Sequence, residues 1–310
     1  MSRILITGGT GFIGANFVHK FVLSKDEVHV FKREDSDLWR IENIKKDIFL
    51  HDVDLADSVC IEKIVSEIKP EHILHFASYG TRQGKEQDTK KTIDTNLLGT
   101  INILNACAKV GFSSFINTGS SSEYGEKNSP MKETDILEPN NLYGVTKAAS
   151  TLYCQQLAKK KNLPVVTMRL FSVFGYMESS DRLIPALVKA VLSGEELKVV
   201  SPSIVRDFIF IEDVIDAYLK AISIIDTIKG NVFNIASGRE LSIADIVEIS
   251  RKVSGKSVKA VYGAVSEKQI EPKMWVGNIE KAKKILHWSS SHTFEEGFSK
   301  LLAHGNRKPE

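Results

Sequence analysis

The first residues of the chain, an apolar strand followed by closely spaced glycines, constrain the fold more than any other feature. The segment Arg3-Ile4-Leu5-Ile6-Thr7 is typical of a buried strand, and an apolar helical pattern follows as far as Leu23. A strand, a tight glycine turn and a helix in this order hold the pyrophosphate of a dinucleotide on backbone N–H groups. The pattern predicts a Rossmann domain whose phosphate-binding residues are Gly8, Gly11, Phe12, Ile13 and Gly14.

Strand and helix patterns alternate through the first half of the chain. Strands are expected near residues 3–7, 27–31, 47–50, 72–76, 113–118 and 164–170, and helices near 14–24, 57–68, 88–110 and 143–162. Such alternation predicts a parallel sheet covered by helices on both faces, with right-handed crossovers. Beyond Gly175 the pattern loosens, and shorter helices are expected near 182–193, 212–225, 242–253 and 278–286.

The fold class predicted from these patterns is α/β. Residues 1–175 are expected to form a doubly wound Rossmann domain. Residues 176–310 are expected to form a smaller C-terminal α/β domain that binds the substrate.

Tyr143 and Lys147 are the residues that indicate chemistry. They stand four positions apart in a helical pattern, so their side chains share one face. A nearby ammonium lowers the pKa of a phenol from about 10, and such a tyrosine can exchange a proton with an alcohol as hydride moves. A serine hydroxyl beside it would stabilise charge on the same oxygen. The cluster Gly119-Ser120-Ser121-Ser122 can supply that serine, so Tyr143, Lys147 and a serine of this cluster are the predicted catalytic residues of a nicotinamide-dependent oxidoreductase.

The end of the second expected strand bears on the choice of cofactor. Lys32 and Arg33 follow the apolar run 27–31, at the place where NAD-binding domains usually carry an acid for the ribose. A basic residue there accommodates the 2′-phosphate of NADP. The sequence favours NADP(H), and NAD(H) is the alternative, with Glu34 or Asp35 as the ribose ligand.

On these motifs the chain resembles the extended short-chain dehydrogenase/reductases of the NAD(P)-dependent epimerase/dehydratase family, whose members act on nucleotide sugars. Further matching segments are Asp54-Leu55-Ala56-Asp57, His75-Phe76-Ala77-Ser78, Asn96-Leu97-Leu98-Gly99-Thr100, Arg169-Leu170-Phe171-Ser172-Val173-Phe174-Gly175 and Arg206-Asp207-Phe208. The resemblance implies that Asp54 and Leu55 contact the adenine, and that Phe76 and Ala77 lie beside the cofactor. It also implies that Arg206 binds the substrate diphosphate, that a strand and a helix near 206–225 return to the Rossmann domain, and that two long helices, near 88–110 and 143–162, form a homodimer.

Departures from the family pattern bear on the reaction. The catalytic serine of the resemblance falls on Ser120, and the acids of the sugar 4,6-dehydratases fall on Ser121 and Ser122, which disfavours a dehydratase. A one-residue gap would instead make Ser121 the catalytic serine and put Glu123 in the place of the acid. Ser121 and Ser122 are therefore candidate substrate contacts, as is Ser172, which replaces an asparagine of the family.

The expected function is the NADP(H)-dependent reduction of a 4-keto-6-deoxy nucleotide sugar. The alternatives are a nucleotide-sugar 4-epimerase with tightly bound NAD, then a 4,6-dehydratase. A different class, an NAD(P)-sensing regulatory protein, would usually lack Tyr143 or Lys147, and both are present. The segment 271–275 stands where the family often carries an Arg-Pro-Gly-Asp sequence, so no second arginine is expected at the diphosphate.

Composition and residue spacing argue against nucleic-acid binding, a metal site and a membrane span. The formal net charge of +2 gives no nucleic-acid footprint. The three cysteines, Cys60, Cys107 and Cys154, are far apart, form no metal-ligand spacing and suit a reducing cytoplasm. The histidines show no ligand spacing either, so no metal is expected. No apolar run approaches the ~18 residues of a membrane span, and a cytoplasmic enzyme is expected.

Overall fold

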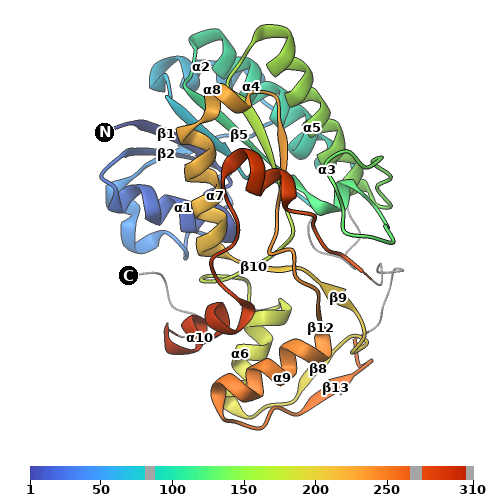
Figure 1. Ribbon diagram of the computed structural model, residues 1–310. Helices are drawn as coiled ribbons and strands as arrows, with labels where there is room; N and C mark the ends of the chain where they lie inside the picture. Colours follow the sequence, from blue (N-terminus) through green and yellow to red (C-terminus); the bar gives the residue numbers. More distant parts are fainter. Residues whose placement is uncertain (81–87, 266–273, 305–310) are drawn as a thin grey trace. The chain divides into compact units, whose positions relative to one another are not determined.

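The computed structural model describes residues 1–80, 88–265 and 274–304, which divide into two compact units (Figure 1). The first unit consists of Met1–Gly125, Ile136–Arg169 and Tyr218–Phe233. The second consists of Glu126–Asp135, Leu170–Ala217 and Asn234–Glu310. The domain boundary expected at residue 175 stays a prediction, and the segment 271–273 lies outside the described residues.

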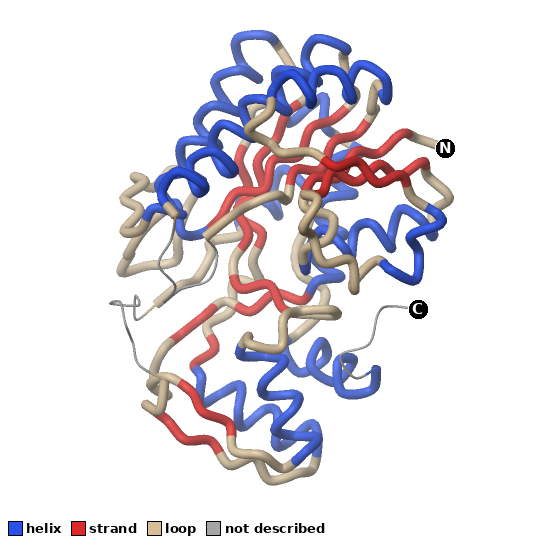
Figure 2. The backbone as a smooth tube through the Cα atoms, turned by 180° about the vertical axis from the view of Figure 1, so that it is seen from behind, coloured by secondary structure: helices blue, strands red, loops and turns tan. Residues whose placement is uncertain are grey.

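A parallel seven-stranded sheet, in the order β11-β6-β5-β4-β1-β2-β3, lies at the centre of the first unit (Figure 2). Its strands are β1 Arg3–Thr7, β2 Glu27–Lys32, β3 Phe49–Asp52, β4 His72–His75, β5 Ser114–Ser120, β6 Val165–Leu170 and β11 Val232–Ile235. Both β2 and β4 pair with β1, so the strand order reverses direction there, and ligands of open α/β sheets bind at such a switch point. The predicted doubly wound sheet is confirmed.

Three helices cover one face of this sheet: α2 Ser58–Ile68, α4 Gly99–Val110 and α5 Leu142–Lys161 (Figure 1). Their apolar stripes share one buried cluster with Leu5, Ile73 and Phe115 from the strands. Neighbouring residues of a strand point to opposite faces, so Val30 faces away from Phe31 and packs near Val18 of α1 Phe12–Leu23. Helices on both faces bury β5 and β6 completely and most of β1, β2 and β4, which explains the apolar composition of these strands.

The helix expected near 88–110 is present, with a π-helical turn in its middle. The segment forms α3 Thr89–Ile93, a π-helical turn η2 Asp94–Leu98, and then α4. The carbonyl of Asn96 accepts hydrogen bonds from the hydroxyls of Ser150, at 2.6 Å, and Thr100, at 2.7 Å. Side-chain donors thus bind a carbonyl at the place where the helix widens, and π-turns of this kind occur frequently at functional sites.

The second unit is built from short strand pairs and helices. Parallel β7 Ser172–Phe174 and β10 Phe208–Phe210 form one pair, antiparallel β9 Val205–Arg206 and β12 Leu241–Ser242 another, and parallel β8 Leu197–Val199 and β13 Ala260–Tyr262 a third. The helices are α6 Leu183–Ser193, the first part of α7 Ile211–Ser223, α9 Ile243–Ser254 and α10 Phe294–His304. The sequence analysis did not foresee α10, and a π-helical turn, η4 Ala282–Leu286, takes up much of the helix expected near 278–286.

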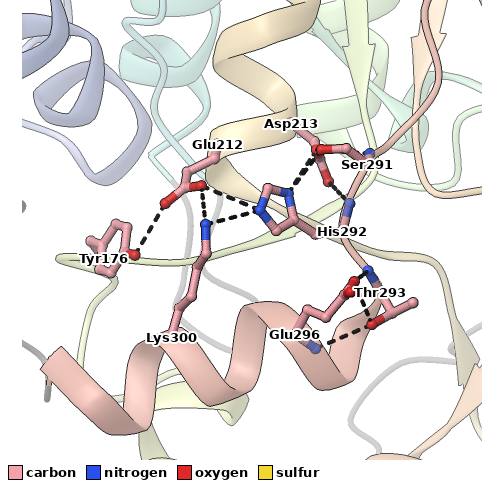
Figure 3. Close-up of polar contacts among 8 residues, drawn as sticks. All are labelled: Tyr176, Glu212, Asp213, Ser291, His292, Thr293, Glu296 and Lys300. Carbon is pink, nitrogen blue, oxygen red and sulfur yellow. Dashed lines mark hydrogen bonds and ion pairs between the residues drawn. The ribbon is translucent and has the colours of Figure 1, made fainter.

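Polar contacts from the start of α7 hold α10 within the second unit (Figure 3). The buried Asp213 accepts hydrogen bonds from the backbone N–H and the hydroxyl of Ser291, at 3.0 and 2.6 Å, and lies 2.9 Å from Nδ1 of His292. Glu212 accepts from Tyr176 and from Lys300 of α10. These contacts satisfy both carboxylates, so the cluster has a structural role.

Candidate active site

The glycine turn between β1 and α1 has the close packing that its sequence predicts. A Cβ atom at Gly14 would lie 2.3 Å from the carbonyl oxygen of Gly8, and Gly8 has a φ of +69° and touches the backbone at Ala77. Helix α1 begins directly after Gly11, and no side chain within the described part of the chain caps its N-terminus. Its first N–H groups and its dipole therefore suit a phosphate, and the residues present fit the predicted dinucleotide.

Strands β1 and β4 are joined beside this turn by a buried hydrogen-bond chain. The hydroxyl of Thr7 lies 2.7 Å from Nδ1 of His75, whose Nε2 lies 2.9 Å from the hydroxyl of Thr100. Complete burial, together with the nearby Lys147 charge, lowers the pKa of His75 to about 3, so the ring is neutral and structural. This chain of hydrogen bonds fixes the start of the segment that contains Phe76 and Ala77, two predicted cofactor contacts.

Lys32 and Arg33, the basic pair predicted to bind the 2′-phosphate of the cofactor, lie at the end of β2, and both form ion pairs with acidic residues. Lys32 forms an ion pair with Asp52 of β3, and the Arg33 Nε atom lies 3.2 Å from Asp35. The Arg33 side chain is half exposed. A 2′-phosphate would therefore have to compete with Asp35 for the guanidinium.

Asp54 and Leu55 follow β3, in the place that the resemblance gives to the adenine contacts. The Asp54 carboxylate accepts from the backbone N–H of Ala56 at 2.9 Å, which shapes an Asx turn. Leu55 is buried and packs against Gly99. A Cβ atom added at Gly99 would lie 2.8 Å from the Cβ atom of Leu55. Asn102 of α4 donates to the Leu55 carbonyl at 2.9 Å, so this loop is held in one conformation.

The serine cluster forms a turn directly after β5. Ser120 ends the strand, and its hydroxyl accepts from the backbone N–H of Ser122 at 3.1 Å, at the start of the 3₁₀ turn η3 Ser121–Glu123. A hydroxyl that accepts in this way can still donate its hydrogen to a ligand oxygen. Ser120 and Ser121 are buried and Ser122 is half-buried.

Helix α5 packs directly on this serine turn. A Cβ atom at Gly144 would lie 2.4 Å from the carbonyl oxygen of Ser122, so only glycine fits beside Tyr143. The helix starts at Leu142, with Asn141 as its N-cap, and the half-buried Tyr143 is in its first turn. The structure therefore brings the predicted serine and tyrosine segments together at the end of β5.

Lys147 is buried in α5, one turn after Tyr143. Only 2 % of its surface is exposed, and burial lowers its pKa, whereas the charge of Glu123 favours the protonated form. Asn96 supports the same helix, because its side-chain amide donates to Thr146 at 2.9 Å and to the Tyr79 carbonyl at 3.0 Å. The π-turn thus connects α5 to the loop after β4.

Glu123, the acid of the alternative one-residue-gap register, has a structural environment that the sequence did not indicate. It is fully buried and forms an ion pair with Arg169 of β6, at 2.7 Å between Oε2 and Nε. The sequence offered only a single charged residue between the serine cluster and Tyr124, which does not by itself indicate a buried ion pair.

The two substrate contacts predicted farther along the chain lie in the second unit. Ser172 begins β7, and its backbone N–H donates to the Asp207 carbonyl at 3.0 Å. Arg206 lies on β9, where its Nη1 donates to the Val205 carbonyl at 2.8 Å. The neighbouring Asp207 carboxylate accepts from Ser237, Gly238 and Gly277, so it holds loops rather than a ligand, although burial raises its pKa to about 6.

Glu178 follows β7 and was not singled out in the sequence. Its side chain is buried, and its Oε2 atom has no hydrogen-bond partner within the described residues. Burial raises its pKa to about 8, against the opposing effects of Arg182 and the Gly175 N–H. The carboxyl group is therefore neutral at pH 7 and can donate a hydrogen bond.

The described residues meet none of the requirements of a metal site, a disulfide or a membrane span. Ranges 1–80, 88–265 and 274–304 contain no group of three or more His, Cys, Asp or Glu side chains placed to hold a metal ion. The three cysteines are free thiols. Among the described helices, none combines the length and the apolar character of a membrane span.

A glycine turn, a serine turn and a Tyr-Lys helix on one parallel sheet define a short-chain dehydrogenase/reductase. Comparison with known proteins gives the family. The family described as "NAD dependent epimerase/dehydratase family" matches residues 4–236. The chain belongs to this family and is an enzyme of it.

Similar proteins that match nearly the full length of the chain include UDP-sugar 4-epimerases. The UDP-glucose 4-epimerase of Lacticaseibacillus casei is 25% identical over 308 residues, covering 93% of this chain and 92% of that protein. The crystal structure of Thermotoga maritima UDP-glucose 4-epimerase with UDP-glucose has a TM-score of 0.87 and 25% identity, and covers 97% of each chain. That of Bacillus cereus UDP-glucuronic acid 4-epimerase with UDP-glucuronic acid and NAD has a TM-score of 0.83 and 27% identity, with 95% and 96% covered.

Proposed function

We propose that the protein is an NAD-dependent 4-epimerase of a nucleotide sugar, and the alternative held in the sequence analysis becomes the main hypothesis. The observation that carries it is the Ser120 turn packed on the first turn of α5, in a chain whose similar proteins include 4-epimerases of UDP-sugars. The reductase first expected has no comparable support among these relatives.

The residues of the first unit would do the proton chemistry. A bound nicotinamide ring supplies the reversible acceptor of hydride. Tyr143 would take the proton of the sugar 4-hydroxyl while hydride leaves C4, and would return a proton to the same oxygen when hydride comes back to the opposite face of C4. Lys147 would favour the phenolate form by its charge, and the Ser120 hydroxyl would donate to the sugar oxygen. In the second unit, Arg206 is the proposed partner of the diphosphate, with Ser172 as a further substrate contact.

The contacts of Glu123 favour Ser120 over Ser121 as the catalytic serine. A dehydratase in the gapped register would need the Glu123 carboxyl as an acid at the substrate. That carboxylate is fully buried and accepts from Arg169, the Ser120 N–H and Thr151. We therefore assign catalysis to Ser120 and substrate contacts to Ser121 and Ser122.

The epimerase proposal predicts product without net redox change. Purified protein supplied with UDP-glucose, UDP-galactose or UDP-glucuronic acid should convert at least one of them to its C4 epimer, because the hydride returns to the same sugar. Chromatography of the nucleotide sugars measures conversion, and absorbance of reduced nicotinamide measures net oxidation. No epimer from any of the three, with steady NADPH consumption on a 4-keto-6-deoxy nucleotide sugar, would establish the reductase instead.

Lys32 and Arg33 are the specific observation that keeps the reductase as a second candidate, since a reductase consumes NADPH. If Arg33 binds a 2′-phosphate, Arg33→Ala should weaken NADPH binding about tenfold or more, since a charged hydrogen bond contributes about 1.5–3 kcal/mol. NADH binding should stay within twofold, because NADH lacks that phosphate. Calorimetry of both cofactors measures this, with Lys45→Ala, an exposed cation on the neighbouring η1 Glu42–Asp47, as the matched control. Equal losses for NADPH and NADH would leave NAD(H) as the cofactor, with Glu34 or Asp35 at the ribose.

We propose a homodimer because several large apolar side chains are exposed on α5 and beside it. Leu98 at the end of the π-turn and Val145 and Leu152 of α5 are 42%, 48% and 55% exposed. Val145 and Leu152 are seven residues apart, so they share one helix face. An apolar face on this helix suits a partner copy of the same chain. A reducing cytoplasm, without nucleic-acid or membrane partners, stays our expectation for where this dimer works.

A further inference from the structure

A buried ion pair lies directly behind the proposed catalytic serine. The side chain of Glu123 is 0% exposed and that of Arg169 is 3% exposed. Both charges are well satisfied, because Arg169 also donates to the Tyr124 hydroxyl at 2.9 Å and stacks over the Tyr124 ring. A buried pair of this kind is weak evidence for stability, since an apolar pair of similar volume often serves equally well. Its presence therefore calls for another explanation.

The Glu123 carboxylate joins three elements of the site. Its Oε1 atom accepts from the backbone N–H of Ser120 at 2.8 Å and from the hydroxyl of Thr151 at 3.0 Å. Ser120 ends β5, Thr151 is on α5, and Arg169 is on β6. Thr151 comes four residues after Lys147, so both lie on the same face of the helix. One side chain thus connects the serine to the helix of the tyrosine and lysine.

We infer that Glu123, held by Arg169, is a positioning residue that fixes Ser120 relative to the α5 helix of Tyr143 and Lys147. This inference rests on the proposed role of Ser120. The Ser120 N–H bond sets the backbone at the point where the strand turns, and the serine hydroxyl direction follows from that backbone. The same carboxylate is the negative charge that favours protonated Lys147 in its buried surroundings.

The test removes both charges together, because Glu123→Gln alone leaves Arg169 as an unpaired buried cation and endangers folding. The variant Glu123→Leu/Arg169→Met removes both charges and the oxygen that accepts from the Ser120 N–H, and it should stay folded at the assay temperature and bind NAD normally. Its kcat for the epimerase reaction should fall about 10- to 100-fold, since a misplacement of about 1 Å can cost a factor near 10². A kcat within twofold of wild type in the folded variant would overturn the inference.

A double-mutant cycle separates positioning from general damage. Ser120→Ala should lower kcat strongly in the wild type but by less than threefold in the Glu123→Leu/Arg169→Met background, because the serine is already misplaced there. The control is Asp213→Asn, which disturbs a different buried carboxylate, and its effect should multiply fully with that of Ser120→Ala. Full multiplication in the Glu123 background would show a merely structural pair. If Ser120→Ala changes nothing in the wild type, the proposed catalytic role of Ser120 fails, independently of whether the pair is needed.

Discussion

Replacing Tyr143 with phenylalanine should lower turnover by about 10²–10⁴-fold, the usual contribution of general acid–base catalysis. The change removes one hydroxyl and keeps the ring, which is half-buried in the first turn of α5. The helix keeps its Asn141 cap and its contact with the serine turn, so folding and NAD binding should be unaffected. Initial rates of epimerisation at saturating substrate, with calorimetric NAD binding on the same sample, measure both quantities.

Helix α5 offers a matched control for this experiment. Tyr153 is on the same helix, and its hydroxyl donates to Asn105 at 2.9 Å. Tyr153→Phe therefore also removes a phenol hydroxyl from α5, but away from the serine turn, and turnover should stay close to that of the wild type. A Tyr143→Phe enzyme that retained more than a tenth of wild-type turnover would contradict the role given to Tyr143.

The second large effect is a pH-dependent gain in stability from Glu178→Gln. Burial raises the pKa of Glu178 to about 8 in the folded protein, against an ordinary value of 4.5. The folded state therefore holds this proton more tightly than the unfolded state, and the wild type loses stability as the pH rises from about 4.5 to about 8. The loss is at most about 1.4 kcal/mol for each pH unit in that window.

Glutamine keeps the shape and the hydrogen-bond donor of the neutral acid but cannot ionise. The variant and the wild type should be similar in stability at pH 5, and the variant should be more stable by a few kcal/mol at pH 9. Urea unfolding at pH 5, 7 and 9 measures the difference. Glu248→Gln, at a largely exposed glutamate of α9, is the control and should show no such trend. A constant difference between Glu178→Gln and wild type across the three pH values would show that the carboxyl group is ionised throughout.

Features that depend on neighbouring residues could be predicted from the sequence. The strand, the glycine turn and helix α1 were foreseen because the close approach of Gly14 to the Gly8 carbonyl arises within seven residues of chain. The shared face of Tyr143 and Lys147 follows from helix periodicity alone. The alternation of apolar segments was enough for the parallel sheet, since a strand buried on both faces has no other pattern. The Asp35 ion pair of Arg33, by contrast, was not visible, because opposite charges near each other in sequence do not specify which of them pair.

The tertiary structure alone decided which charges are buried and what they contact. In the sequence, Glu123 is a carboxylate next to the serine cluster and therefore a candidate acid. In the structure, Arg169, which lies 46 residues later in the chain, pairs with Glu123, and the buried carboxylate holds Ser120. The π-turn at Asn96 forms because Ser150 and Thr100 donate to its carbonyl, and Glu178 is neutral because surrounding chain segments exclude water from it. Local sterics and periodicity act over a few residues and are written in the sequence. Desolvation and ion pairing depend on segments that become neighbours only when the sheet and its helices pack together.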